Sequence, residues 1–132
     1  MTEQQKKAFM SFQQGELDAV MMYRKLADLT DDSELKEAFL EAAKDEGRHA
    51  AICRKYTGKE LKASDGLANI ISKAYKFVPR SLLLRGVAIG EYKGGDSYRP
   101  YIADFPELEE IMFDEYRHGD KMKSLAKRGK VK

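Results

Sequence analysis

A five-residue pattern, Asp-Glu-x-Arg-His, occurs twice in the chain and contains its only two histidines. In each copy a Glu precedes the His by three residues, Glu46 before His49 and Glu115 before His118. On a helix such a pair lies on one face about one turn apart, so both side chains can bind the same metal ion. The repeat therefore predicts two related helices that each contribute a Glu and a His to a metal site. The alternative is two ordinary histidines, on the surface or in the core.

The length of 132 residues predicts one domain, spanning residues 1–132, that can bury about two-thirds of its unfolded surface. The single cysteine, Cys53, excludes an internal disulfide and a thiolate-bound zinc or iron site, so any redox partner must be separate. We interpret it as a small buried hydrophobic residue rather than a redox sensor. The net charge of +2 predicts no nucleic-acid partner. Because no apolar run has signal or membrane-spanning length, we expect a cytoplasmic protein without stable membrane insertion.

Apolar residues recur at helical spacing over four long segments, at about residues 3–29, 31–56, 79–104 and from 104 onward. Asp31 and Glu34 have the spacing of a capping box at the start of the second segment, and Gly58 should end it. Asp104 should start the fourth segment, with Pro106 in its first turn. The chain is thus expected to be all-α, with four long helices.

Each predicted long helix carries one glutamate in the middle of its apolar stripe, and these are Glu16, Glu46, Glu91 and Glu115. Burying an unpaired carboxylate is costly, so cations are expected among them. Four carboxylates and two divalent cations would together be neutral. Carboxylate oxygens with imidazole suit iron or manganese, and the lack of thiolates argues against a structural zinc site.

The first and third helices also share a pattern, in which Gly-Glu is followed by a tyrosine seven residues after the Glu. The tyrosines are Tyr23 and Tyr98. The chain therefore reads as two related helix pairs, each with a lone Glu and then a Glu-x-x-His. The two tyrosines could hydrogen-bond the site carboxylates or act as redox-active catalytic neighbours. The alternative is that they are core aromatic residues with satisfied hydroxyl groups.

Residues 58–79 form a connection that is too long for a tight turn, and its apolar spacing predicts a short amphipathic helix within it. We interpret it as a crossover along the bundle. Lys73, Lys76 and Arg80 could contact a membrane surface or an acidic partner, but we favour a solvated outer face.

The third long helix contains four glycines, Gly86, Gly90, Gly94 and Gly95, each of which costs about 0.8–1 kcal/mol relative to Ala. Close helix packing through small residues would explain them. A local bulge or open space for a small ligand beside Glu91 is the alternative. Pro100 is expected to kink the end of this helix.

These motifs resemble the rubrerythrin branch of the ferritin-like superfamily over nearly the whole chain. The resemblance implies a ferritin-like four-helix bundle with a long crossover between helices 2 and 3. Residues 55–60 and the Leu/Gly-rich approach to Glu91 also resemble the ferritin-like domain of vacuolar-iron-transporter-like proteins.

The resemblance also implies roles for individual residues around two iron ions, with manganese or a mixed pair as alternatives. Glu46 and Glu115 would bridge the ions. One ion would be completed by Glu16 with His49, and the other by Glu91 with His118. Asp45 and Asp114 would accept hydrogen bonds from the imidazole N–H groups and fix their orientation.

By the same resemblance the protein would be a homodimeric oxidoreductase active in oxidative stress. It would reduce hydrogen peroxide or dioxygen with electrons from a separate donor protein such as a rubredoxin. The chain departs from the family in having Gly94 where a further carboxylate is usual, and in lacking the cysteines of a rubredoxin domain. A non-enzymatic module that buffers, senses or delivers iron is the main alternative, and a helical scaffold with a vestigial site is another.

Overall fold

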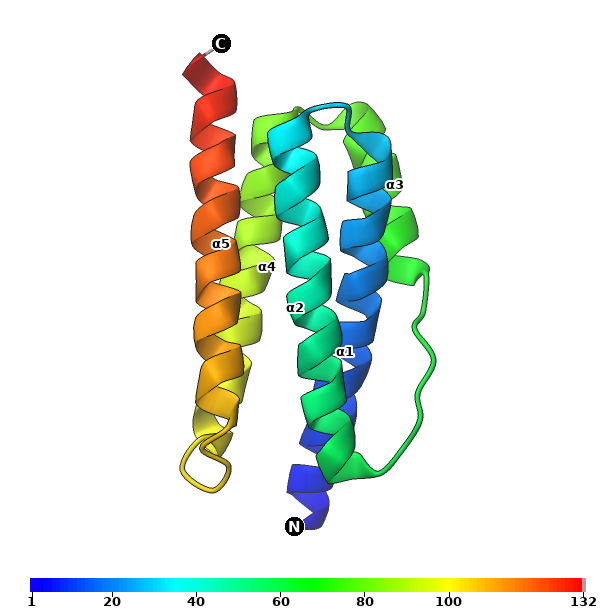
Figure 1. Cartoon of the computed structure of the whole chain (residues 1–132), viewed down its shortest axis with the longest axis vertical. Helices are drawn as coiled ribbons and strands as arrows, with labels where there is room; N and C mark the ends of the chain where they lie inside the picture. The colour runs from blue at the N-terminus through cyan, green and yellow to red at the C-terminus, as the bar shows by residue number, and fades with distance from the viewer. Residues whose placement is uncertain (132) are drawn as a thin grey trace. The chain divides into compact units, whose positions relative to one another are not determined.

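The computed structural model describes the backbone of residues 1–131 and the side chains of residues 1–128, and these residues form helices and the connections between them, with no strand (Figure 1). The elements are α1 (Glu3–Leu29), α2 (Ser33–Thr57), α3 (Gly66–Phe77), α4 (Arg80–Tyr98), the 3-10 helix η1 (Arg99–Tyr101) and α5 (Leu108–Val131). The chain divides into two compact units, an N-terminal unit of residues 1–76 and a C-terminal unit of residues 77–132. The all-α prediction is therefore confirmed.

In the N-terminal unit, α1 and α2 run antiparallel and are joined by a short connection (Figure 1). The cap of α2 is Asp32, whose carboxylate accepts hydrogen bonds from the backbone N–H groups of Glu34 and Leu35. The prediction of Asp31 was wrong by one residue, because it is Asp32 that directly precedes the first turn and can reach those N–H groups. Gly58 ends α2 in a left-handed conformation with φ 63°, as predicted.

The core of the N-terminal unit is made by apolar side chains from both helices. Phe9, Leu26, Leu35, Phe39 and Cys53 are all buried. Burying one large apolar side chain contributes about 1.5–3 kcal/mol. The burial of the free Cys53 agrees with its interpretation as a small hydrophobic residue.

The connection between α2 and α3 is fastened to α1 by three hydrogen bonds that side chains of α1 make with its backbone. Gln13 donates to the carbonyl oxygen of Lys59 at 2.8 Å, and Gln14 donates to that of Lys62 at 2.9 Å. The backbone N–H of Ser64 donates to Asp18 at 2.7 Å. The short helix predicted within the connection is present as α3. The residues between α2 and α3 run along α1.

The C-terminal unit pairs α4 with α5, but both boundaries at the turn between them differ from prediction. Helix α4 ends at Tyr98 and not near Asp104, because Pro100 has no N–H to continue an α-helix. Pro100 thus lies in η1 and does not kink a longer helix. Helix α5 begins at Leu108, so Pro106 precedes this helix and is not in its first turn.

Two glycines of the C-terminal unit lie directly under tyrosine rings of the facing helix. A Cβ on Gly95 would lie 2.6 Å from Cε1 of Tyr116, and one on Gly119 would lie 2.7 Å from Cε1 of Tyr92. Atoms cannot approach so closely without a shift, so each tyrosine ring requires the glycine opposite it. The packing explanation is correct for Gly95.

The other glycines of α4 have different surroundings. Gly86 and Gly90 face open space, whereas a Cβ on Gly94 would lie 3.4 Å from Oε2 of Glu115. Close helix packing therefore does not explain Gly86 and Gly90, which are exposed, and the alternative of space for a ligand beside Glu91 stays a prediction.

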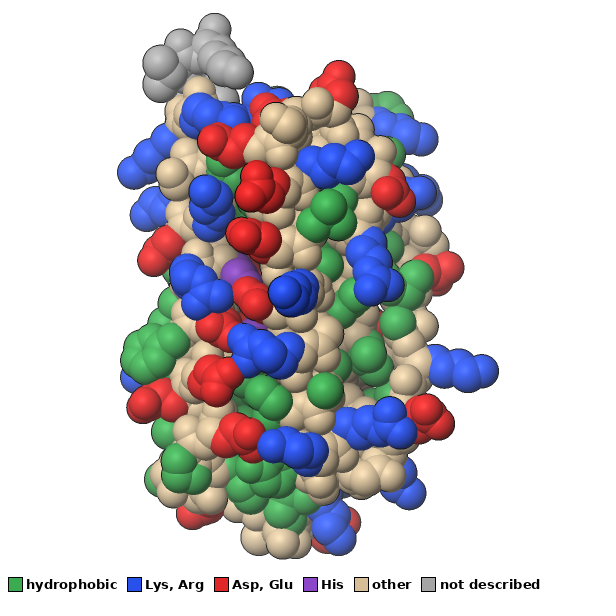
Figure 2. Space-filling model, in the orientation of Figure 1, with side chains coloured by type: hydrophobic (Ala, Val, Ile, Leu, Met, Phe, Trp, Pro, Cys, Tyr) green, Lys and Arg blue, Asp and Glu red, His purple; other side chains and the backbone are tan. Residues whose placement is uncertain are grey.

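None of the helices in the described part of the chain is long and apolar enough to cross a membrane. On the face that Figure 2 shows, acidic and basic side chains are interspersed.

Candidate metal centre

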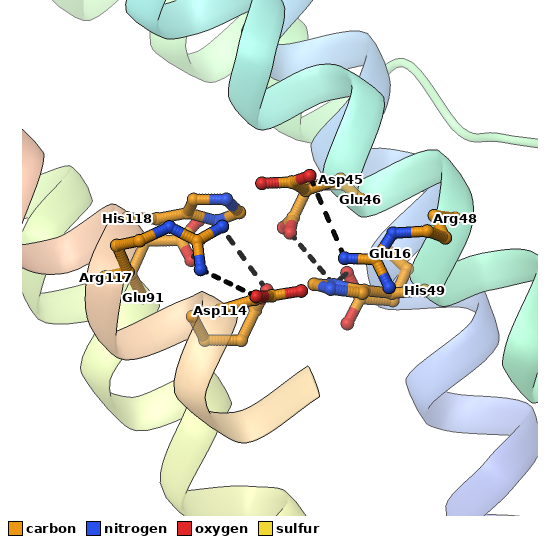
Figure 3. Close-up of polar contacts among 10 residues, drawn as sticks. Glu16, Asp45, Glu46, Arg48, His49, Glu91, Asp114, Arg117 and His118 are labelled. Carbon is orange, nitrogen blue, oxygen red and sulfur yellow. Dashed lines mark hydrogen bonds and ion pairs between the residues drawn. The ribbon is translucent and has the colours of Figure 1, made fainter. Parts of the chain in front are cut away.

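The N-terminal unit brings one Glu of α1 together with the Glu-x-x-His of α2. Nδ1 of His49 lies 3.4 Å from Oε1 of Glu16 and 3.3 Å from Oε1 of Glu46 (Figure 3). All three side chains are at most 4% exposed. We call these residues the N-terminal triad.

The local sequence explains why these three side chains meet. The spacing of three residues between Glu46 and His49 places both on one face of α2, and the apolar stripe around them faces α1. Glu16 lies in the stripe of α1, so antiparallel pairing of the two stripes brings it to the same point. Packing of the apolar residues therefore carries the polar groups into the interior.

The C-terminal unit repeats the arrangement with Glu91 of α4 and with Glu115 and His118 of α5. Nδ1 of His118 lies 3.3 Å from Oε2 of Glu91 and 3.8 Å from Oε1 of Glu115. The three side chains are at most 7% exposed. We call these residues the C-terminal triad. The six residues that the sequence analysis gave as metal ligands thus lie in the two triads, and their binding of metal and the bridging roles stay predictions.

The distances and the donor atoms of each triad fit a metal ion. Ligand atoms bound about 2.1 Å from one ion at tetrahedral or octahedral angles are roughly 3.0–3.4 Å apart. Three of the four His–Glu separations are 3.3–3.4 Å, and only that between His118 and Glu115 is longer. The ligand atoms within each triad also lie within 4.8 Å of one another. Two carboxylates and one imidazole suit iron, manganese or zinc.

In both histidines Nδ1 is the ring nitrogen that faces the carboxylates. A hydrogen bond at the other ring nitrogen, Nε2, would fix the tautomer and the orientation of the ring.

Asp45 and Asp114 each pair with the arginine three residues later in the repeated pattern. Asp114 accepts a hydrogen bond from Nη1 of Arg117 at 2.7 Å, and Oδ1 of Asp45 lies 3.8 Å from Nη2 of Arg48 (Figure 3). The sequence analysis gave the arginines no role, although their spacing from the aspartates is that of helical ion pairs. The proposed contact of these aspartates with the imidazoles stays a prediction.

Tyr23 and Tyr98 are both buried, each within its own unit. The ring of Tyr23 lies 6.1 Å from that of Phe39, so it is part of the aromatic core of the N-terminal unit. The suggestion that the two tyrosines act in catalysis stays a prediction.

Two other tyrosines of the C-terminal unit, each directly after a triad glutamate, were missed. Tyr92 donates a hydrogen bond to Asp120 at 2.5 Å, and this bond, with a smaller effect of burial, raises the pKa of the tyrosine. The hydroxyl of Tyr116 hydrogen-bonds Asp96. Their rings cross between α4 and α5 just outside the triad. A sequence signal existed, because each helix pairs a tyrosine after its Glu with a glycine one turn further on.

Comparison with known proteins gives one family. The family model described as Rubrerythrin matches residues 10–126, which include both triads and most of the chain. No curated protein and no solved structure matches the chain significantly.

Proposed function

The chain belongs to the rubrerythrin family, and on this premise we propose that its two triads together hold two iron ions in an oxidoreductase. The substrate would be hydrogen peroxide or dioxygen, and the electrons would come from a separate donor protein. The observation that supports the proposal most is the same buried set of two Glu and one His in each unit, with His–Glu distances suited to a bound metal.

The triads would hold the ions by charge and by geometry. Glu46 and Glu115 would each bridge the two ions, and the remaining Glu and His of each unit would complete one ion. Buried carboxylates are unfavourable alone, so four of them form a strong site for two divalent cations. When bound, reduced iron would supply the two electrons that convert hydrogen peroxide and two protons to two water molecules.

The surrounding residues would tune this site. Arg117 and Arg48 pair with the aspartates of their own helices, which limits the rotation of those side chains. Gly94 leaves the side of Glu115 without a further carboxylate, so a small oxidant could approach there. Tyr23 and Tyr98 would donate hydrogen bonds to the carboxylates of the triads. A homodimer remains a prediction.

Elemental analysis tests the metal site. Wild-type protein saturated with iron should contain two metal ions per chain. Glu46→Ala and Glu115→Ala should each lose both ions, because each residue is proposed to bridge. The exposed Glu60→Ala is a matched control and should keep two. One ion per chain in saturated wild-type protein would contradict the dinuclear site.

Turnover with peroxide tests the activity. The iron-loaded protein with a chemical reductant should consume many equivalents of hydrogen peroxide per chain, whereas metal-free protein should not. Gly94, where the family usually has a further carboxylate, favours a second candidate, a non-enzymatic module that buffers, senses or delivers iron. Iron binding with no more than one turnover would support this candidate and exclude the oxidoreductase.

A further inference from the structure

The outer side of α3 is apolar but exposed. Leu67 is 40% exposed, Ile70 is 66% exposed and Phe77 is 84% exposed. At 100° per residue these three side chains fall within one 80° sector of the helix, whereas the buried Ala68 lies on a different side. An amphipathic helix of a globular protein normally turns its apolar stripe to the core, so this exposed strip, which we call the α3 strip, is unusual.

The only charged residues within α3 itself are two lysines. Lys73 and Lys76 follow the strip on one side of the helix, and both are exposed. From Gly66 to Gly90 the chain has four basic residues and no acidic residue, although the whole chain has 24 basic and 22 acidic residues. The strip therefore lies in a basic segment, although residues 121–132 form a second one, with six basic residues and no acidic residue.

We propose that α3 binds the surface of an anionic lipid bilayer. The helix would lie in the plane of the interface, with Ile70 and Phe77 among the acyl chains. Lys73 and Lys76 would extend to the lipid phosphates, as long cationic side chains do at membrane surfaces. A short helix with large apolar side chains on one side and lysines beside them is typical of interfacial anchors.

Two features favour a bilayer over a protein as the occupant. The α3 strip is a single exposed helix side whose side chains project, and its most exposed member is the aromatic Phe77, which suits insertion into a soft surface. The connection before α3 is already fastened to α1 through Gln13, Gln14 and Asp18, so binding would not need to order that segment. This site is separate from both triads and goes beyond the proposed function.

Tryptophan fluorescence can locate the contact, because the chain has no tryptophan. The variants Phe77→Trp and Phe113→Trp each place one tryptophan at an exposed phenylalanine, the second in α5. Vesicles of phosphatidylcholine with about a third phosphatidylserine should shift the emission of the Phe77→Trp protein to shorter wavelength. They should leave the Phe113→Trp emission unchanged. Equal shifts in both variants, or no shift in either, would overturn the proposal.

Vesicle sedimentation of the full chain tests the chemistry of the contact. Wild type should bind the anionic vesicles, bind pure phosphatidylcholine much more weakly, and be released by high salt. Ile70→Ser with Phe77→Ser, and Lys73→Glu with Lys76→Glu, should each weaken binding at least about tenfold. The controls Ile89→Ser with Phe113→Ser, and Lys121→Glu with Lys123→Glu, change exposed residues of the same types and should bind like wild type.

Circular dichroism should show the same helix content in all variants, because every changed side chain is exposed. Wild-type protein that fails to sediment with anionic vesicles would overturn the proposal. Size-exclusion chromatography gives a second contrary outcome. If wild type forms a dimer that Ile70→Ser with Phe77→Ser dissociates, and vesicles do not compete with that dimer, the α3 strip is covered by a second copy of the chain.

Discussion

The two units hold the same two glutamates and one histidine in their triads but pack differently just beside them. When the ligands are aligned, Val20 and Gly47 of the N-terminal unit correspond to Gly95 and Tyr116 of the C-terminal unit. In the first unit a Cβ on Gly47 would lie 3.9 Å from a methyl group of Val20, so the glycine opposes a mid-sized side chain with room to spare. In the C-terminal unit the large side chain, Tyr116, is on α5, and the glycine that faces it, Gly95, is on α4.

A second pair shows the same exchange. Leu17 and Ala50 of the N-terminal unit correspond to Tyr92 and Gly119 of the C-terminal unit. Wherever one helix gains a tyrosine ring, the facing helix has a glycine, as close packing of interiors requires. The comparison shows that the two triads have the same residues, whereas the neighbouring positions differ in which of the two facing helices carries the larger side chain. It also shows that Gly95 and Gly119 have a structural cause that Gly15 and Gly47 do not share.

The largest expected effect concerns what the units have in common. Metal should stabilise the folded chain by about 4 kcal/mol per site at a thousandfold excess over Kd, because the unfolded chain has no preformed site. His49→Ala and His118→Ala should each reduce this gain to a similar extent, since each removes one ligand from one triad. Thermal unfolding with iron or manganese and with a chelator measures the gain. If one of the two variants keeps the full gain, the triads are not equivalent.

The next effect concerns where the units differ. Gly95→Ala and Gly119→Ala should each destabilise the protein by about 1–3 kcal/mol, because the new methyl group meets a tyrosine ring. Gly47→Ala, the corresponding change in the N-terminal unit, should not destabilise, since its nearest neighbour is 3.9 Å away. Urea unfolding measures the free energies. In a Tyr116→Ala background Gly95→Ala should cost much less, and an unchanged cost would show that the ring is not the cause.

A smaller effect of opposite sign is expected at glycines that face open space in either unit. Gly15→Ala in α1 and Gly86→Ala in α4 should each stabilise the protein by about 0.5–1 kcal/mol, because Ala restricts the unfolded chain and favours the helix. The same urea unfolding experiment measures the gain. Destabilisation by either change would show that these positions are covered by something, such as a second chain.

The features that the sequence predicted are those set by spacing along a single helix. The bounds of α1 and the members of each triad follow from apolar stripes and from the Glu-x-x-His spacing, which are local. The cap of α2 was missed by one residue because Asp31 and Asp32 are adjacent and either carboxylate has suitable chemistry. The end of α4 was missed because apolar spacing continues past Pro100, although its backbone cannot.

The tyrosine–glycine pairs were not predicted because they depend on the register between two helices. Gly95 and Tyr116 meet only when α4 and α5 are aligned at one particular offset, and the pattern on either helix alone does not give that offset. The same limit applies to Asp45 and Asp114. Their arginine partners lie on their own helices and could have been predicted, whereas a contact with an imidazole of another helix could not.

The smallest expected effect is the pH dependence that Tyr92 gives to the C-terminal unit alone. Its hydrogen bond to Asp120 raises the pKa of the tyrosine above the value of about 10 in the unfolded chain, so the folded state holds this proton more tightly. The resulting stability is fully present below about pH 10 and is lost as the pH rises through the folded-state pKa. Tyr92→Phe keeps the ring over Gly119 and removes only the hydroxyl, so at pH 8 it should cost about 0.5 kcal/mol or less for this surface pair. The difference from wild type should shrink above pH 10. A gap that stays constant across this pH range would show that the hydroxyl of Tyr92 does not stabilise the unit through Asp120.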